Sequence, residues 1–148
     1  METARLLLVD DNPDNLEVLA VLLGENYNVV SCGSAAEALR AVETVRPDLL
    51  VLDIGMTPVD GVQCLQSIRA LPGYSRIPAI ALTAFARDIE RRAFLDAGFQ
   101  AVVTKPILDH DTLEAAIERL LESPAARPRR ARTGRPKPGD EPILRSAS

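Results

Sequence analysis

Residues 6–11 read LLLVDD, a short apolar run that ends in two adjacent carboxylates, Asp10 and Asp11. Three more polar residues end or directly follow apolar runs further along the chain, and they are Asp53, Thr83 and Lys105. Lys105 stands out, because every other positive side chain in residues 1–136 is an arginine. Polar groups at the ends of several runs point to a site assembled where the strands of one sheet finish.

Apolar runs alternate with amphipathic stretches along most of the chain. The runs that predict strands are 6–9, 29–30, 49–52, 77–82 and 101–103. The stretches with apolar residues at helical spacing are 13–23, 34–45, 61–70, 87–97 and 109–121. Short apolar strands joined through helices are typical of a parallel sheet covered on both faces, with right-handed crossovers. The predicted fold class is therefore α/β, a doubly wound (βα)5 unit.

Length and composition indicate one domain followed by a basic tail. The 148 residues are 47% hydrophobic and 26% charged, the profile of a single soluble globular domain, expected over residues 1–123. Residues 1–122 hold 10 Lys and Arg against 19 Asp and Glu, whereas 123–148 hold 7 against 2. Rich in Pro and Arg, residues 124–148 are predicted to be disordered, because they cannot bury enough apolar surface to offset the entropy of ordering.

Several classes of function and location are excluded by what the sequence lacks. The first apolar run is too short for a signal sequence or a membrane span, so a cytoplasmic protein without a membrane partner is predicted. Cys32 and Cys64 have no metal-ligand spacing, and we expect buried, reduced thiols. The basic tail has no interleaved aromatic residues and no helical periodicity, so no specific binding of nucleic acid is predicted.

The polar run ends also predict a chemistry. In a doubly wound sheet they would converge outside the carboxyl ends of the strands. Crowded carboxylates repel by about 4 kcal/mol per close pair at an effective dielectric near 20. Mg²⁺ could offset that repulsion, since it takes carboxylate oxygens and completes its shell with water and phosphate, and Lys105 would add positive charge. Asp53, at the centre, is then the predicted nucleophile toward phosphorus, with the Thr83 hydroxyl donating to a phosphoryl oxygen.

Four motifs together resemble the receiver domain of two-component response regulators. They are LLLVDD at 6–11, DIGMTPVDG at 53–61, LTA at 82–84 and TKP at 104–106. Their order and separations resemble the family over roughly residues 4–122. The resemblance implies a flavodoxin-like five-stranded parallel sheet with strand order 2-1-3-4-5. Because only 26 residues follow residue 122, we expect a stand-alone, single-domain regulator.

The resemblance implies a phosphoacceptor and a metal site. Asp53 would accept a phosphoryl group from a histidine kinase or a histidine phosphotransfer protein. Asp11 and the backbone carbonyl of Gly55 would join Asp53 on Mg²⁺, and Asp10 would act largely through water. The chain would thus be a signalling phosphoacceptor, and no enzyme beyond catalysing its own phosphorylation and dephosphorylation.

The resemblance also implies how the phosphoryl group is sensed. Thr83, Ala84 and Lys105 match the family's switch and phosphate-contact positions. The peptide bond before Pro106 is expected to be cis, because X-Pro bonds pay little for that isomer. Phosphorylation would then change the binding of a downstream protein target, which the sequence does not identify, and the resemblance leaves room for a phosphorylation-dependent dimer.

Three positions depart from the family pattern. Val102 stands where receivers commonly have a Tyr or Phe that moves with the threonine. Pro58 follows Thr57, whereas the family has proline directly after the preceding methionine, and Gly55 offers no side chain beside the phosphoryl group. We therefore expect switching to run through the Thr83 loop and the helix that begins near residue 87.

Two other classes of function share part of this pattern. A phosphoaspartyl hydrolase of the haloacid-dehalogenase type would use Asp53 with Thr57 four residues on, but it needs a general acid where Gly55 stands. The second alternative is a receiver-like protein interaction module that is not phosphorylated. The five polar run ends disfavour that module only weakly.

Taken singly, the site residues have plainer interpretations. Asp10 and Asp11 could end a strand and cap the next helix. Asp60 with Gly61 is interpreted as a turn and a helix start. His110 is interpreted as a surface residue near the start of the last helix. The joint spacing of all the motifs favours function over these separate structural roles.

Overall fold

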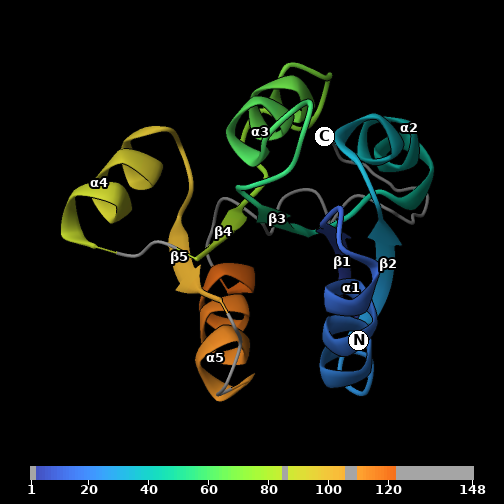
Figure 1. Cartoon of the computed structure of the whole chain (residues 1–148). Helices are drawn as coiled ribbons and strands as arrows, with labels where there is room; N and C mark the ends of the chain where they lie inside the picture. The colour runs from blue at the N-terminus through green and yellow to red at the C-terminus, as the bar shows by residue number, and fades with distance from the viewer. Residues whose placement is uncertain (1–2, 85–86, 106–109, 123–148) are drawn as a thin grey trace.

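Strands and helices alternate along the whole described part of the chain (Figure 1). A computed structural model describes residues 3–84, 87–105 and 110–122, so the tail predicted at 124–148 lies outside it. The strands are β1 (Arg5–Val9), β2 (Asn28–Cys32), β3 (Leu49–Asp53), β4 (Ala79–Thr83) and β5 (Ala101–Thr104). The helices are α1 (Pro13–Leu23), α2 (Ala35–Val45), α3 (Gly61–Arg69), α4 (Asp88–Asp96) and α5 (His110–Leu121). Among these helices, none is both long and apolar enough to cross a membrane.

The strands form one parallel sheet in the order β2-β1-β3-β4-β5, which confirms the predicted fold. Its register brings the ends of neighbouring strands level with one another. Val9 pairs with Leu52, so the residues after β1 lie beside the end of β3. Thr83 pairs with Thr104 in the same way at the ends of β4 and β5. The switch in strand order lies between β1 and β3, where a ligand site is expected.

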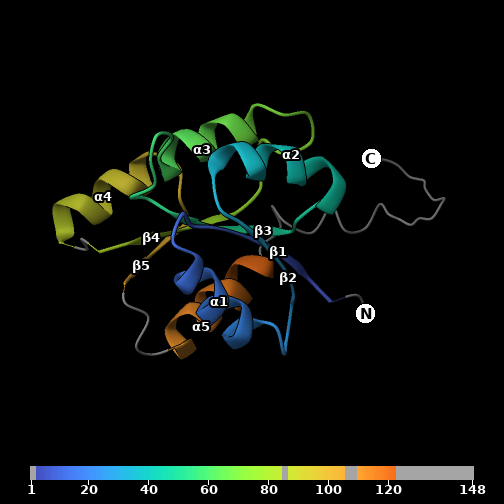
Figure 2. The same cartoon turned by 45° about the vertical axis from the view of Figure 1, so that its right-hand side comes forward.

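Helices cover both faces of the sheet. In Figures 1 and 2, α2, α3 and α4 lie on one face and α1 and α5 on the other. Successive residues of β1 alternate between the two cores, with Leu6 facing α1 and α5 and Leu7 facing α2 and α3. All five residues of β3 are buried, which explains why its sequence reads as a continuous apolar run.

Side-chain caps mark the starts of three helices, and two of these, α1 and α3, follow the strands that lead into Asp10 and Asp53. Asn12 caps α1, because its side chain accepts hydrogen bonds from the main-chain N–H groups of Asp14 and Asn15. At α3, Asp60 accepts from the main-chain N–H of Gln63 at 2.9 Å, and the Gln63 side chain accepts from that of Asp60 at 3.1 Å. This capping box confirms Asp60 as a helix start.

Both cysteines are free and buried, as predicted. Burial raises the pKa of the Cys64 thiol to about 11, and it also raises the pKa of Cys32. Since the thiolate is the reactive form, both side chains behave as small apolar groups of the core.

Gly61, the first residue of α3, packs directly against the end of β3. A Cβ at this position would lie 2.6 Å from the carbonyl oxygen of Asp53 and 3.0 Å from the Cα of Ile54. Both atoms belong to the main chain, so they cannot make room without shifting the strand end that carries Asp53. The close approach of helix to strand therefore requires glycine at position 61.

We expect Gly61→Ala to lower the free energy of unfolding by about 1–3 kcal/mol, because the added methyl group must push α3 and β3 apart. Gly55→Ala is the matched control, since a Cβ there meets only the Asp53 Oδ1, at 3.8 Å. Urea unfolding of the native chain and both variants measures the difference. Equal free energies of unfolding for the two variants would contradict the claim that the close approach of α3 to β3 requires glycine at position 61.

Candidate functional site

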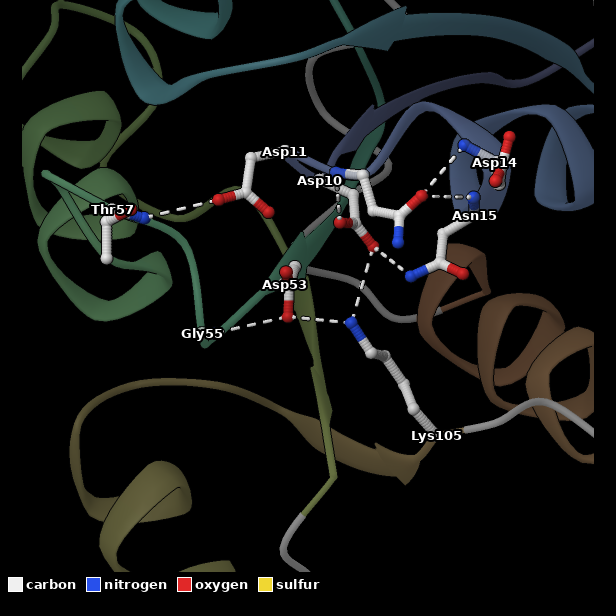
Figure 3. A network of polar contacts seen from close by, with 9 residues as sticks. Asp10, Asp11, Asp14, Asn15, Asp53, Gly55, Thr57 and Lys105 are labelled. Carbon is white, nitrogen blue, oxygen red and sulfur yellow. Dashed lines mark hydrogen bonds and ion pairs between the residues drawn. The ribbon is translucent and has the colours of Figure 1, made fainter.

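The ends of β1, β3, β4 and β5 bring the five polar run ends together at one edge of the sheet. Figure 3 shows that Asp10 and Asp11 approach Asp53 from the loop after β1, while Lys105 reaches in from the end of β5. Thr83 ends β4, is 4% exposed, and its carbonyl accepts a hydrogen bond of 2.8 Å from the main-chain N–H of Lys105. The structure thus places side by side the residues that the sequence predicted to converge.

Three carboxylates form a compact cluster. One oxygen each from Asp10, Asp11 and Asp53 lies within 4.8 Å of the others. Asp10 and Asp53 are 1% and 5% exposed, whereas Asp11 is exposed to solvent. The main-chain N–H of Thr57 donates to the Asp11 Oδ2 at 3.4 Å. Hard oxygens at this spacing, two of them buried and one open to solvent, fit a Mg²⁺ ion that keeps some of its waters.

Lys105 brings a positive charge against two of these carboxylates. Its Nζ lies 3.1 Å from the Asp53 Oδ1 and 3.5 Å from the Asp10 Oδ2 (Figure 3). The same Asp53 oxygen accepts a hydrogen bond of 3.1 Å from the main-chain N–H of Gly55. Two donors on one oxygen hold the Asp53 carboxylate in a single orientation.

Burial and neighbouring charges shift the pKa values of two groups in this cluster, Asp10 and Lys105. Burial raises the pKa of Asp10, and the charge of Asp53 raises it further, although hydrogen bonds from Asn12 and Asn15 and the charge of Lys105 act in the opposite direction. For Lys105, burial alone would lower the pKa, but its hydrogen bond to Asp53 and the charges of both aspartates outweigh burial and raise it. Lys105 therefore stays charged at neutral pH, and Asp10 is a carboxylate whose ionisation the fold opposes.

A cavity of about 370 Å³ opens beside Asp53. Six of its lining residues come from the ends of three strands, and they are Asp53, Ile54, Gly55, Thr83, Ala84 and Lys105. The other two, Glu90 and Phe94, come from α4. A cavity of this size, with a carboxylate on its floor and a lysine at its wall, can hold a small anion such as a phosphoryl group.

Sequence reasoning did not identify Glu90 and Phe94. Their spacing of four residues indicates a shared face of the helix. Nothing in the sequence tells which face of α4 turns toward the strand ends, because that depends on how the helix packs. The peptide bond between Thr57 and Pro58 is cis, which the sequence did not predict.

Two other predicted positions fall wholly or partly outside the described residues. Pro106, where a cis bond was expected, lies outside the described residues. His110 begins α5, as expected, but its side chain is also outside the described part of the structure.

Val102 is 8% exposed, and its carbonyl accepts a hydrogen bond of 3.0 Å from the Arg91 Nη1 on α4.

Residues 6–118 match the family described as the response regulator receiver domain. An uncharacterized 14.6 kDa protein of Leptolyngbya boryana is 41% identical over 103 residues, which cover 69% of this chain and 79% of that protein. The transcriptional regulatory protein GlrR of Escherichia coli K12 is 39% identical over 124 residues, which cover 82% of this chain but 27% of GlrR. The chain thus corresponds to only one part of that longer regulator.

A solved structure supports the same assignment. The receiver domain of sensor histidine kinase PA1611 from Pseudomonas aeruginosa PAO1 has a TM-score of 0.73 and 32% identity, covering 82% of this chain and 100% of that domain. A magnesium ion is coordinated in the active site cleft of that domain.

These matches do not favour the haloacid-dehalogenase hydrolase, and they do not favour the interaction module without phosphorylation. They indicate a part in phosphorelay signalling and place the chain outside the classical enzyme families. With a family match across most of its length and a relative that is 41% identical, the chain belongs to the receiver domain family of two-component response regulators.

Proposed function

We propose that Asp53 accepts a phosphoryl group from the phosphohistidine of a histidine kinase or a histidine phosphotransfer protein. The observation that carries this proposal is the cluster of Asp10, Asp11 and Asp53 with Lys105 hydrogen-bonded to Asp53. A buried carboxylate beside a cavity, held by two donors and flanked by hard oxygen ligands, has the arrangement that phosphoryl transfer needs, since that reaction depends mainly on positioning and charge neutralisation.

Asp10, Asp11 and Asp53, with the backbone carbonyl of Gly55, would hold Mg²⁺. When bound, the ion would supply positive charge to the oxygens of the transferring phosphoryl group. The fit of the carboxylates to such an ion supports this assignment, as does the magnesium ion in the cleft of the PA1611 receiver domain.

The transfer itself exchanges one bond to phosphorus for another. An oxygen of Asp53 attacks the phosphorus in line, the new O–P bond forms, and the P–N bond to the donor imidazole breaks, with its electron pair staying on the imidazole nitrogen. Lys105, already 3.1 Å from Asp53, would pair with a phosphoryl oxygen. The Thr83 hydroxyl and the main chain at Ala84 would contact the others, since both residues line the cavity. Hydrolysis of the acyl phosphate would return Asp53 to its starting state.

The proposal also covers the bounds of the domain, its location and its output. We propose that the receiver domain spans residues 1–123, that it works in the cytoplasm, and that the phosphorylated form signals by binding a downstream protein or by dimerising. The kinase-linked receiver domain of PA1611 and the transcriptional regulator GlrR illustrate the two kinds of protein to which this chain is similar.

Incubation of the native chain with acetyl phosphate and Mg²⁺ is expected to add the mass of one phosphoryl group, and EDTA should abolish the addition. Asp53→Asn replaces the nucleophilic carboxylate by a neutral amide and should remain unmodified, whereas Asp96→Asn, an exposed substitution at the end of α4, should behave like the native chain. Intact mass spectrometry measures the added mass in the native chain and in both variants. Failure of the native chain to take up acetyl phosphate and to bind beryllofluoride would overturn the proposed function.

The same carboxylates should make the chain less stable when Mg²⁺ is absent. Because burial and Asp53 raise the pKa of Asp10, the stability that this group contributes is present at low pH and is lost as pH rises through its folded pKa. We therefore expect Asp10→Asn to melt a few degrees above the native chain at pH 7 in EDTA. The gap should close as pH falls below the usual range for an aspartate.

Thermal unfolding followed by circular dichroism between pH 3 and pH 8 tests this dependence. Asp14→Asn, an exposed substitution in the first turn of α1, is the matched control and should not melt above the native chain. With saturating Mg²⁺ the order should reverse, since Asp10→Asn binds the ion less well. A gap that does not change with pH would show that the charge of Asp10 is not its cause.

A further inference from the structure

The helix α4 is held to the rest of the domain by few buried groups. None of its nine residues, all of them described, is buried, and Ile89 is 75% exposed. Phe94 packs against the core in a partly buried position, and Arg91 donates to the carbonyl of Val102 on β5 at 3.0 Å. A helix anchored by so little apolar contact is among the elements that move most readily.

One face of this helix brings a negative charge to the cavity beside Asp53. Glu90 and Phe94, one turn apart, both line that cavity, and the Glu90 side chain is 25% exposed. The Arg87 guanidinium donates to both oxygens of Glu90 and is itself 80% exposed. Hydrogen bonds from Arg87 hold the pKa of Glu90 below its usual range, so Glu90 is ionised at neutral pH.

Among the described residues, no bulky side chain fills the Gly55 side of this cavity. A Cβ built at Gly55 would meet only the Asp53 Oδ1, at 3.8 Å, so the space around the Asp53 carboxylate is open there. An anion attached to Asp53 would therefore share the cavity with Glu90. Phosphorylation would replace the single charge of Asp53 by a charge of about −2, which increases the repulsion on Glu90.

We propose that Glu90 is the positioning residue that couples phosphorylation of Asp53 to α4. Repulsion between the phosphoryl group and Glu90 shifts the helix away from the strand ends and loosens its contact with β5. The proposal rests on the proposed function, because it requires a phosphoryl group on Asp53. It also gives this chain a route of coupling in which Val102 needs no aromatic ring, since the charge acts directly on the helix.

Hydrogen–deuterium exchange of the full chain, with and without Mg²⁺ and beryllofluoride as the phosphoryl mimic, tests the coupling. In the native chain, peptides covering α4 should exchange several times faster when the mimic is bound. Glu90→Gln keeps the size of the side chain but removes its charge, so it should lose most of this increase while binding the mimic about two- to fivefold more tightly at low salt. Glu43→Gln, an exposed substitution on α2, is the matched control and should behave like the native chain.

Arg87→Gln gives an independent variant. Without its partner, the charge of Glu90 acts undiminished on the cavity, so the mimic should bind more weakly than in the native chain. The effect should vanish when Glu90→Gln is added, which a double-mutant cycle would reveal. An increase in α4 exchange that is as large in Glu90→Gln as in the native chain would overturn the proposal and leave the proposed function intact. Failure of the native chain to bind the mimic would overturn both.

Discussion

The central constraint on this molecule is the crowding of like charges where β1 and β3 lie side by side. Main-chain pairing of Val9 with Leu52 places the residues that follow beside one another, so Asp10 meets Asp53 where both side chains are buried. A protein selected for stability alone would not bury two carboxylates there. The fold tolerates them because the repulsion between the carboxylates is offset by Lys105 and by hydrogen-bond donors from neighbouring loops. On our proposal, a divalent cation offsets it further.

The arrangement separates rigid and movable parts of the site. Asp53 ends a strand whose residues are all buried, and the start of α3 closes tightly over that strand end at Gly61. The opposite wall of the cavity belongs to α4, which has no buried residue. On our proposals, phosphoryl transfer, which needs accurate positioning, takes place on the fixed part, and the element that responds to it is the less firmly anchored helix.

Much of this could be predicted from the sequence, because the decisive features are local or periodic. Continuous apolar runs predicted the buried strands, and Asp60 was predicted to start the helix that it caps. The convergence of the polar run ends followed from the rule that parallel strands finish at the same edge of a sheet. Glu90 escaped prediction because its importance depends on the angle at which α4 packs, which arises from contacts between distant segments. The need for glycine at position 61 likewise depends on how closely a helix approaches a strand.

The main-chain pairing that sets the reacting groups in place has a consequence for how such proteins diversify. Since the sheet positions Asp53 and its neighbours through backbone hydrogen bonds, the outward faces of the helices are released from any part in the chemistry. Exposed apolar residues on α1 and α4, such as Val21 at 70% and Ile89 at 75%, can be exchanged without disturbing the strand ends. On our proposal, duplicated copies of such a domain can therefore acquire separate signalling partners through substitutions on these outward faces, while the strand ends keep the same reacting groups.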